Sequence, residues 1–515
     1  MSSTAPSSAS IEGFSRPLGN LEGFFKSLSD SGKPLNREHW TIHFVLRLKF
    51  PPSVTDPIPH LQYAWEILRV RHPTLGATLQ EPESNNSQGS LSVGPLNIRE
   101  WARNTFHVCR EYADANQLFS ALYSTPTATC YWLPASCEFV IRSSHWRIDG
   151  VGMAFLGHEF MTILAKVVPT ANAGAPAGDL LVTEMSSSPA SVSPSLEDLA
   201  KDQSPHANSG GDDPVLAAGA DELVGIFLRG VPSIGLPTRE SSSTAGVVPG
   251  PSARVMTSLD VEKTSQVSAA CRRMGITVTS AVHAAIVRVT ARYPQHPLCK
   301  SYAAFVPVDL RRALDETATP RTKNISKVVG LYFSGLPVRV DNVFTKSFEE
   351  VARDLAIVYG RDLSRFWSPP PSPETEAGDL EGKMIGLLDL AEPYVQRTTA
   401  LFNAPVPEGL PPVQTPDLSS LGRMESSIKK EYADEDNDQD GNRKVQVVDF
   451  WVGTEMLTRN VQFHVWSWDG SLRLGASFNT SFYDKRFVTE VTRAVIAELL
   501  DGCEIGNGND RGALE

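Results

Sequence analysis

A strand that passes through a short turn into a long helix, within residues 138–166, constrains the fold of this chain more than any other feature. Residues 138–142 partly alternate apolar and polar side chains, which predicts a strand. Residues 151–166 have the spacing of a helix whose polar positions share one stripe. The turn between them therefore lies at a rigid junction, from which side chains can point into a cleft.

The turn contains His145-Trp-Arg-Ile-Asp149-Gly150, a histidine followed by a carboxylate and a glycine. An imidazole with an unperturbed pKa of about 6.5 can accept a proton near neutral pH. We expect Asp149 to fix the local backbone and Gly150 to leave space for a ligand. Taken alone, His145 is equally consistent with a packed or capping histidine, and Asp149 is structural in either interpretation.

Length and charge limit the class of protein. A chain of 515 residues exceeds what one hydrophobic core usually organises, so we expect two or three domains. The proportions of hydrophobic residues (41%) and charged residues (21%) are typical of an ordinary globular protein. The net charge of −12 argues against nucleic acid or an anionic membrane as partner, because both need concentrated lysine and arginine.

Three signals together predict a cytoplasmic protein. Residues 1–10 contain no apolar segment of the kind found in signal peptides. The most apolar window, residues 151–168, contains His158, Glu159 and Lys166, so we expect an amphipathic helix and no membrane span. The six cysteines are scattered, which is typical of reduced thiols. The histidines have no metal-ligand spacing, so no metal site is expected.

Composition divides the chain into two ordered units and two irregular segments. Residues 169–252 are rich in serine, alanine, glycine and proline, and residues 368–442 contain three consecutive prolines and an acidic run. The expected division is a mobile leader at 1–20, an N-terminal domain at 21–168, a low-complexity insertion and linker at 169–252, a C-terminal domain at 253–500 with a disordered loop at about 405–442, and a tail at 501–515.

Local patterns predict elements within both units. Residues 39–50 alternate cleanly and predict a long, half-buried strand, and residues 59–70 predict a helix. Asp469-Gly470 lies between two apolar stretches and predicts a hairpin. We expect Asp484 to cap the last helix and Pro393 to interrupt a helix at residues 384–400.

Five segments, in this order, resemble the chloramphenicol acetyltransferase-like superfamily of CoA-dependent acyltransferases with an HxxxDG motif. They are the strand at 39–50, Arg71-His-Pro-Thr-Leu75, His145 to Gly150, Asp449-Phe-Trp-Val-Gly453 and Ser477-Phe-Asn-Thr-Ser-Phe-Tyr-Asp484. The superfamily includes plant-type CoA acyltransferases, condensation domains of peptide synthetases and fungal trichothecene acetyltransferases, and the resemblance to the last group is the strongest.

The resemblance implies an α/β fold of two similar domains, each a mixed sheet flanked by helices, meeting at a central tunnel. It implies that His145 is the general base, that Asp149 and Gly150 support the site, and that Arg311 is the partner of Asp149. In the superfamily the Asp449-to-Gly453 segment is architectural. The implied reaction uses acetyl-CoA as co-substrate, no bound cofactor, and a small alcohol acceptor such as a trichothecene or related terpenoid in fungal secondary metabolism. A monomer is expected.

Two departures and several alternatives remain. Condensation domains have a second histidine where this chain has Ser144, which favours CoA as donor. Plant-type members have Asp-Phe-Gly-Trp-Gly where this chain has Asp449-Phe-Trp-Val-Gly453.

Two alternatives to a CoA-dependent acyltransferase stay open. One is a condensation-type enzyme with a carrier-bound donor, and the other is a noncatalytic binding homologue. A polyketide is an alternative acceptor alcohol. The donor to the reaction's oxyanion is not identified, and serine, threonine or tryptophan near 451–467 are candidates.

Overall fold

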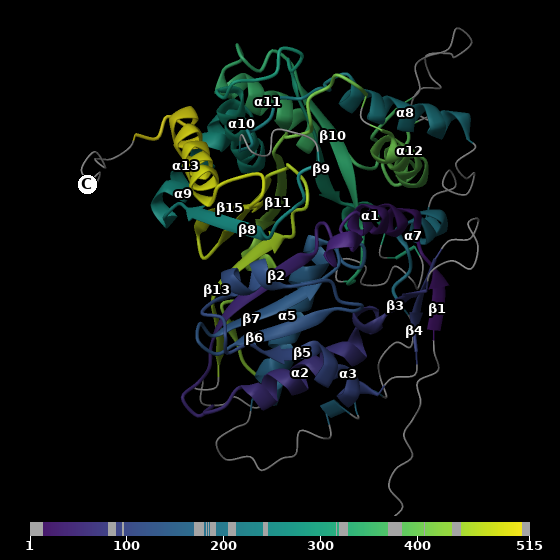
Figure 1. Ribbon diagram of the computed structural model, residues 1–515, viewed down its shortest axis with the longest axis vertical. Coiled ribbons are helices and arrows are strands. Elements are labelled where there is room, and N and C mark those ends of the chain that lie inside the picture. Colours follow the sequence, from purple (N-terminus) through teal and green to yellow (C-terminus); the bar gives the residue numbers. More distant parts are fainter. Residues whose placement is uncertain are drawn as a thin grey trace, which may run out of the picture.

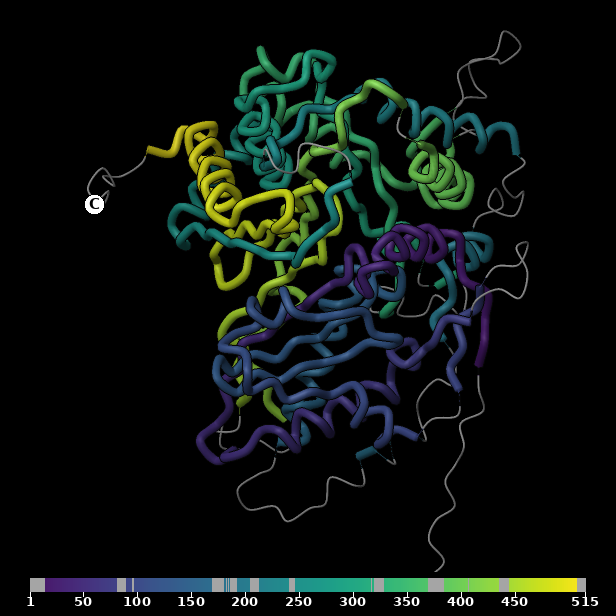
Figure 2. The backbone as a smooth tube through the Cα atoms, in the orientation of Figure 1, coloured from purple at the N-terminus to yellow at the C-terminus, as the bar shows by residue number. Residues whose placement is uncertain are grey.

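The computed structural model describes residues 14–80, 89–94, 97–168, 180–181, 183, 185, 192–203, 213–239, 246–315, 317–318, 328–368, 384–405, 407–434 and 444–506. Two α/β units lie one above the other along the long axis of the molecule (Figure 1). The chain up to about residue 168 forms most of the lower unit, and a yellow-green segment from the C-terminal part returns to it (Figure 2).

A six-stranded mixed sheet, in the order β12-β13-β2-β7-β6-β5, forms the lower unit. Its strand pairs are antiparallel except β5–β6. Phe139 of β7 stacks on Phe160 of α5 with ring centroids 4.1 Å apart, so α5 covers one face. The bounds are β2 Ile42–Lys49, β5 Phe106–Val108, β6 Thr129–Leu133, β7 Glu138–Ser143, β12 Glu431–Tyr432, β13 Val445–Thr454, α2 Ile58–Arg71, α3 Ile98–Thr105, α4 Ala115–Ala121 and α5 Gly150–Val167.

The predicted strand at 39–50 is confirmed as β2, but the expected half-burial is wrong. Residues 42–46 are all buried, and His43 and Val45, which alternate with Phe44, are each only 1% exposed. The reason is that β2 lies between β7 and β13 in the middle of the sheet, and both faces are covered.

The upper unit contains a four-stranded mixed sheet, β11-β14-β15-β8, and the antiparallel pair β9–β10. Asp469 and Gly470 have φ of 55° and 71° and form the predicted two-residue hairpin between β14 and β15. The bounds are β8 Ser252–Ser258, β9 Tyr302–Asp309, β10 Phe333–Val340, β11 Asp417–Arg423, β14 Gln462–Trp468, β15 Ser471–Asn479, α7 Leu196–Gln203, α8 Pro214–Leu228, α9 Val261–Met274, α10 Val278–Ala291, α11 Phe348–Tyr359, α12 Ala391–Asn403 and α13 Lys485–Gly502.

The C-terminal part of the chain crosses back into the lower sheet. β13 pairs antiparallel with β2, from Gln446 opposite Lys49 to Thr454 opposite Ile42. The expected assignment of 253–500 to a single C-terminal domain is therefore wrong for this segment. The physical reason is that β2 without β13 would be an edge strand with unpaired backbone groups.

Segments expected to be mobile are partly ordered. Within the predicted leader, β1 (Phe14–Pro17) pairs with β4 (Ser90–Val93) beside β3 (Thr78–Gln80), and α1 (Asn20–Asp30) follows. Within the predicted loop at 405–442, β11 and β12 form, because the buried side chains of Leu418, Met424 and Ile428 anchor the chain. Residues 1–13, 406, 435–443 and 507–515 lie outside the described residues.

The insertion at 169–252 also contains regular structure. α7 and α8 both pack against α12 on the upper right of Figure 1. Pro393 lies in the first turn of α12, where a proline is tolerated, so it does not interrupt the helix as expected. Asp484 precedes α13 as expected, but its side chain pairs with Arg239 and does not cap the helix.

Two buried apolar clusters stabilise the units. One lies between the lower sheet and its helices, and the other fills the upper unit. Leu21 and Phe25 of α1 belong to the upper cluster, so the N-terminal helix joins the two halves. Among the described helices, none alone has the length and apolar character needed to cross a membrane; α9 and α10 reach it only jointly, with a 95° bend between them.

Candidate active site

The predicted strand–turn–helix junction is present. β7 ends at Ser143 and α5 begins at Gly150. Asp149 is the N-cap of α5, and its Oδ1 accepts a hydrogen bond from the Gly152 N–H at 2.7 Å. The turn that contains His145 is thus fixed at both ends by regular structure.

Aromatic rings surround the His145 imidazole. Its ring stacks on Phe25 of α1 at 4.8 Å, and the rings of Phe333 and Trp40 lie at 5.5 and 6.3 Å. Burial among these rings lowers the pKa of His145 to about 4, although the charge of Asp149 opposes the shift. The imidazole is therefore neutral at pH 7 and able to accept a proton.

A cavity of about 720 Å³ reaches the imidazole from between the two units. This volume lies within the usual range for small-molecule sites. Trp40 and Val452 line it from the lower unit, and Phe305, Phe333 and His464 from the upper unit. His145 is partly accessible and lines the cavity, while its Nδ1 is buried without a hydrogen-bond partner among the described residues.

The expected partner of Asp149 is present. Arg311 Nη1 donates to Asp149 Oδ2 at 3.0 Å and Nη2 donates to Oδ1 at 3.1 Å. The Tyr332 N–H donates to the same Oδ2 at 2.7 Å. Burial would lower the pKa of Arg311, but the carboxylates of Asp149 and Asp309 raise it. The carboxylate of Asp149 thus binds Arg311 and backbone N–H groups, which is a structural arrangement.

Gly150 lines the cavity at the start of α5. A Cβ added there would lie 3.3 Å from Leu421 Cδ2 of β11, across the cavity wall. At Gly152 an added Cβ would lie 2.9 Å from Ile148 Cγ2 and 3.2 Å from the Gly330 carbonyl oxygen. A side chain at Gly150 would therefore reduce the space in the cavity, whereas a side chain at Gly152 would disturb close packing.

Asp449 and Gly453 lie on β13, outside the cavity lining. The Asp449 carboxylate pairs with Arg473 of β15 in the upper unit. Gly453 pairs with His43 of β2, and an added Cβ would lie 3.3 Å from Trp451 and 3.4 Å from Phe119. The cavity lining includes their neighbours Val452 and Thr454 but neither residue itself. Both positions shape the strand that crosses between the units.

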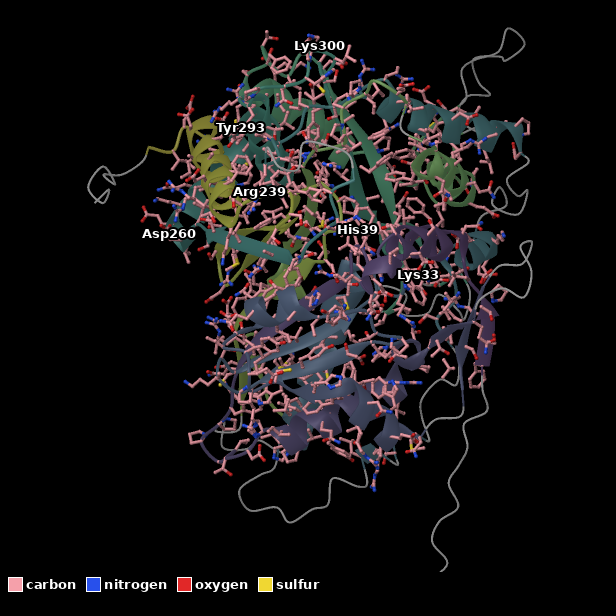
Figure 3. The ribbon with its side chains drawn as sticks, in the orientation of Figure 1. Lys33, His39, Arg239, Asp260, Tyr293 and Lys300 are labelled. Carbon is pink, nitrogen blue, oxygen red and sulfur yellow. The ribbon has the colours of Figure 1, made fainter. Side chains whose placement is uncertain are left out.

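His464 is a cavity residue that the sequence did not single out. It lies on β14 and is 3% exposed. Burial, with smaller contributions from the charges of Arg254 and His145, lowers its pKa to about 3. His39, which lies where the two units meet (Figure 3), stacks on Trp40 at 4.6 Å. Strand alternation on β14 was the only signal for His464, and it does not distinguish a cavity from a core.

Part of the window expected to hold the oxyanion donor, residues 451–467, lines the cavity. Thr454 lines the cavity and donates from its hydroxyl to the Gln462 side-chain oxygen. Trp466 and Trp468 are each 1% exposed and pack in the core.

The remaining histidines of interest lie elsewhere. His72 is the C-cap of α2 and contacts Glu159. His158 is half-buried, and its Nδ1 bonds the Tyr432 hydroxyl at 2.9 Å. Within the described part of the chain, no group of three or more His, Cys, Asp or Glu side chains is arranged to hold a metal ion.

Relatives that are similar along nearly the whole chain include fungal acetyltransferases. Acetyltransferase pigO of Monascus ruber is 26% identical over 506 residues, which are 97% of each chain. O-acetyltransferase pigM of the same organism is 27% identical, covering 94% of this chain and 85% of the relative. A protein of Epichloe uncinata named loline biosynthesis cluster 1 transcription factor lolU1 is 28% identical, covering 96% of this chain and 95% of the relative. No family model matches the chain.

Solved structures share the architecture. Trichothecene 15-O-acetyltransferase TRI3 of Fusarium sporotrichioides aligns with a TM-score of 0.73 at 16% identity, covering 95% of each chain. The chain therefore has the fold of this acetyltransferase, which is the chloramphenicol acetyltransferase-like fold. The first condensation domain of the calcium-dependent antibiotic synthetase has the same fold, with a TM-score of 0.60 at 12% identity over 95% of this chain and 97% of the domain.

Ser144 distinguishes this chain from the condensation-domain pattern. Its side chain is buried and its hydroxyl donates to a carboxylate oxygen of Glu38. The residue before the motif histidine thus fixes a loop in this chain and does not add a second imidazole to the site.

Proposed function

We propose that this chain is an O-acyltransferase that moves an acetyl group from acetyl-CoA to a hydroxyl of a fungal secondary metabolite, with His145 as general base. The observation that carries the proposal is a neutral, partly accessible His145 imidazole in a cavity that both units line. The fungal acetyltransferases among the relatives and the fold of trichothecene 15-O-acetyltransferase support it.

The proposed reaction is direct acyl transfer without an enzyme-bound intermediate. Because Nδ1 of His145 is fully buried, Nε2 is the nitrogen that takes the hydroxyl proton. The hydroxyl oxygen then attacks the thioester carbonyl, and the tetrahedral intermediate collapses with loss of the CoA thiolate. The imidazolium returns its proton to this thiolate, so the products are an acetate ester and free CoA. General-base assistance of this kind contributes about 10²–10⁴-fold.

The walls of the cavity favour an apolar acceptor alcohol. Phe25 and Phe333 lie beside the imidazole, and Phe305 and Leu401 also line the cavity. A hydroxylated terpenoid, such as a trichothecene, buries its skeleton against such walls and presents a hydroxyl to His145. An acyl-carrier donor is the competing proposal, and the burial of Ser144 in place of a second histidine favours CoA.

A role in transcription, which the name of lolU1 raises, has less support in this chain. DNA binding requires concentrated positive charge, whereas the net charge here is −12. An electrophoretic mobility assay at low salt checks it, and specific binding to DNA would favour the transcription role over the enzyme.

The deciding experiment is mass spectrometry of products formed from acetyl-CoA and a panel of terpenoid and polyketide alcohols. We expect one acetylated product with free acetyl-CoA and less with a loaded carrier protein. His145→Ala should lower the rate by about 10²–10⁴-fold. His296→Ala, at an exposed histidine outside the cavity, is the matched control and should leave it unchanged. Full activity in His145→Ala would refute the base assignment.

A further inference from the structure

The cavity has a second polar end, formed by Asp417, Asn460 and Gln462. All three side chains line the cavity and are partly accessible. Asp417 begins β11 and pairs in register with Gln462 of β14. Because the rings beside His145 are those of Phe25, Trp40 and Phe333, this cluster offers a separate place for a polar group of a ligand to bind.

The Asp417 carboxylate has more hydrogen-bonding capacity than its protein partners use. Asn460 Nδ2 donates to Asp417 Oδ2 at 2.7 Å, whereas Oδ1 is buried and has no hydrogen-bond partner among the described residues. A carboxylate can accept about four hydrogen bonds, and buried polar groups in folded proteins are nearly always paired. Burial raises the pKa of Asp417 to about 7, so the neighbouring Asn460 and Gln462 offset only part of the lost hydration. A hydrogen-bond donor on a ligand in the cavity would give this carboxylate the partner that it lacks.

The position of Asp417 is fixed by the backbone around it. The Tyr302 hydroxyl donates to the Pro416 carbonyl oxygen at 2.8 Å. The Asp417 N–H donates to the Val461 carbonyl oxygen at 3.2 Å. A polar group that is held in place before a ligand arrives loses little entropy when it binds, which is how binding sites gain selectivity.

Strand register separates this end of the cavity from the histidines. Asp417 pairs with Gln462, and Ser419 pairs with His464. Two residues along a strand span roughly 7 Å. His464 is close enough to His145 for their charges to interact. A ligand that extends along the cavity from His464 to Asp417 therefore spans about two strand residues, which is roughly the length of one ring with its substituents.

We propose that Asp417 binds a second hydroxyl of the acceptor alcohol, so that the protein selects rigid diols over mono-alcohols of the same shape. The inference rests on the proposed function only in that the acceptor alcohol occupies this cavity. Acetyl-CoA is a poorer occupant of this end above about pH 7, where the Asp417 carboxyl is mostly ionised and repels the phosphates.

Binding can be measured without turnover in the full-length His145→Ala protein, by calorimetric titration in the absence of acetyl-CoA. The probes are trans-1,4-cyclohexanedimethanol, cyclohexanemethanol, which lacks the second hydroxyl, and pantetheine, which represents the donor. Asp417→Ala is added to this background. Asp469→Asn is the control, an exposed aspartate on the β14–β15 turn where asparagine tolerates the positive φ.

We expect the diol to bind about tenfold more tightly than the mono-alcohol, since one well-placed hydrogen bond contributes about this much. Asp417→Ala should abolish the preference, and Asp469→Asn should keep it. If the alanine variant does not fold, Asp417→Asn replaces it in the test. The new amide has a single oxygen, and the Asn460 side chain would occupy it, so none is left for the second hydroxyl. The proposal is overturned if the diol and the mono-alcohol bind with equal affinity, or if neither binds. It is also overturned if both Asp417 variants keep the preference for the diol. A third contradicting result is that the Asp417 variants change the affinity for pantetheine alone. Because binding needs neither His145 nor acetyl-CoA, a failed transferase assay leaves this result intact.

Discussion

Asp149 of the lower unit and Arg311 of the upper unit form a buried, two-point ion pair directly behind the turn that holds His145. The two nitrogen–oxygen distances are 3.0 and 3.1 Å, and the side chains are 5% and 2% exposed. The same carboxylate caps α5, so one residue connects the start of a helix, the partner unit and the position of the imidazole.

Breaking this pair should destabilise the whole molecule. Asp149→Asn leaves the Arg311 guanidinium buried with only Asp309 as a charged partner, and loss of one member of a buried pair costs about 3–5 kcal/mol. Arg311→Lys keeps the charge but loses the two-point geometry, so we expect a smaller loss. Urea unfolding followed by circular dichroism measures both. Glu490→Gln, which breaks the exposed pair with Arg486, should be nearly neutral; an equal loss there would contradict the special role of the buried pair.

The pH dependence of kcat/KM should reveal the buried base. Burial lowers the pKa of His145 to about 4, and a base works only when it is unprotonated. The rate should therefore be flat with respect to this group from about pH 5 to 8 and fall about tenfold per pH unit below about pH 4. Circular dichroism at each pH separates this loss from acid unfolding. An acidic limb near pH 6.5 instead would show that the imidazole is solvated in the free enzyme.

Two glycines near the motif should respond differently to alanine. In Gly150→Ala the new methyl group meets only Leu421 across the cavity wall, so KM for the acceptor alcohol should rise with little loss of stability. In Gly152→Ala the methyl group presses on Ile148 and on the Gly330 carbonyl, and crowding of this kind typically costs about 1–3 kcal/mol. Steady-state kinetics and thermal unfolding of both variants test the contrast. A large stability loss in Gly150→Ala with normal KM would reverse these assignments.

Stability should depend on pH through Asp417. Burial raises its pKa from 3.8 to about 7, so between these values the folded state binds a proton that the unfolded state releases. The free energy of unfolding contributed by this group therefore falls as pH rises from 4 to 7, and is constant above that. Asp417→Asn removes this pH dependence. Its free energy of unfolding should rise relative to the wild type by up to a few kcal/mol as pH increases across this range. The free energy of unfolding is measured against pH by urea unfolding of both proteins. Parallel curves would mean that the pKa of the Asp417 carboxyl is not shifted by folding.

Local features of the fold could be predicted where the chain's own periodicity determines them. The strand before His145, the helix after Asp149 and the hairpin at Asp469-Gly470 are present as predicted, because alternation, helical spacing and turn chemistry act over a few residues. The pairing of Asp149 with Arg311 came from the superfamily resemblance, since no local pattern connects residues in different units.

The features of the fold and the site that could not be predicted from the sequence depend on pairing between distant segments. β11 has the sequence Asp-Leu-Ser-Ser-Leu-Gly-Arg, which has little strand propensity, and it forms because β14 supplies a parallel partner. The place of β13 beside β2 is equally invisible in a single chain. Phe25, Asp417 and His464 reach the cavity only through these contacts, so their part in the site could not be inferred from neighbouring residues.

The β13 ladder limits how this molecule can move. β13 moves with the lower sheet, because a contiguous row of backbone bonds holds it to β2 from one end of that strand to the other. Any relative motion of the two halves must therefore be taken up by the chain on either side of β13. Cutting the gene into separate halves would likewise strip the lower sheet of β12 and β13, the two strands at one of its edges.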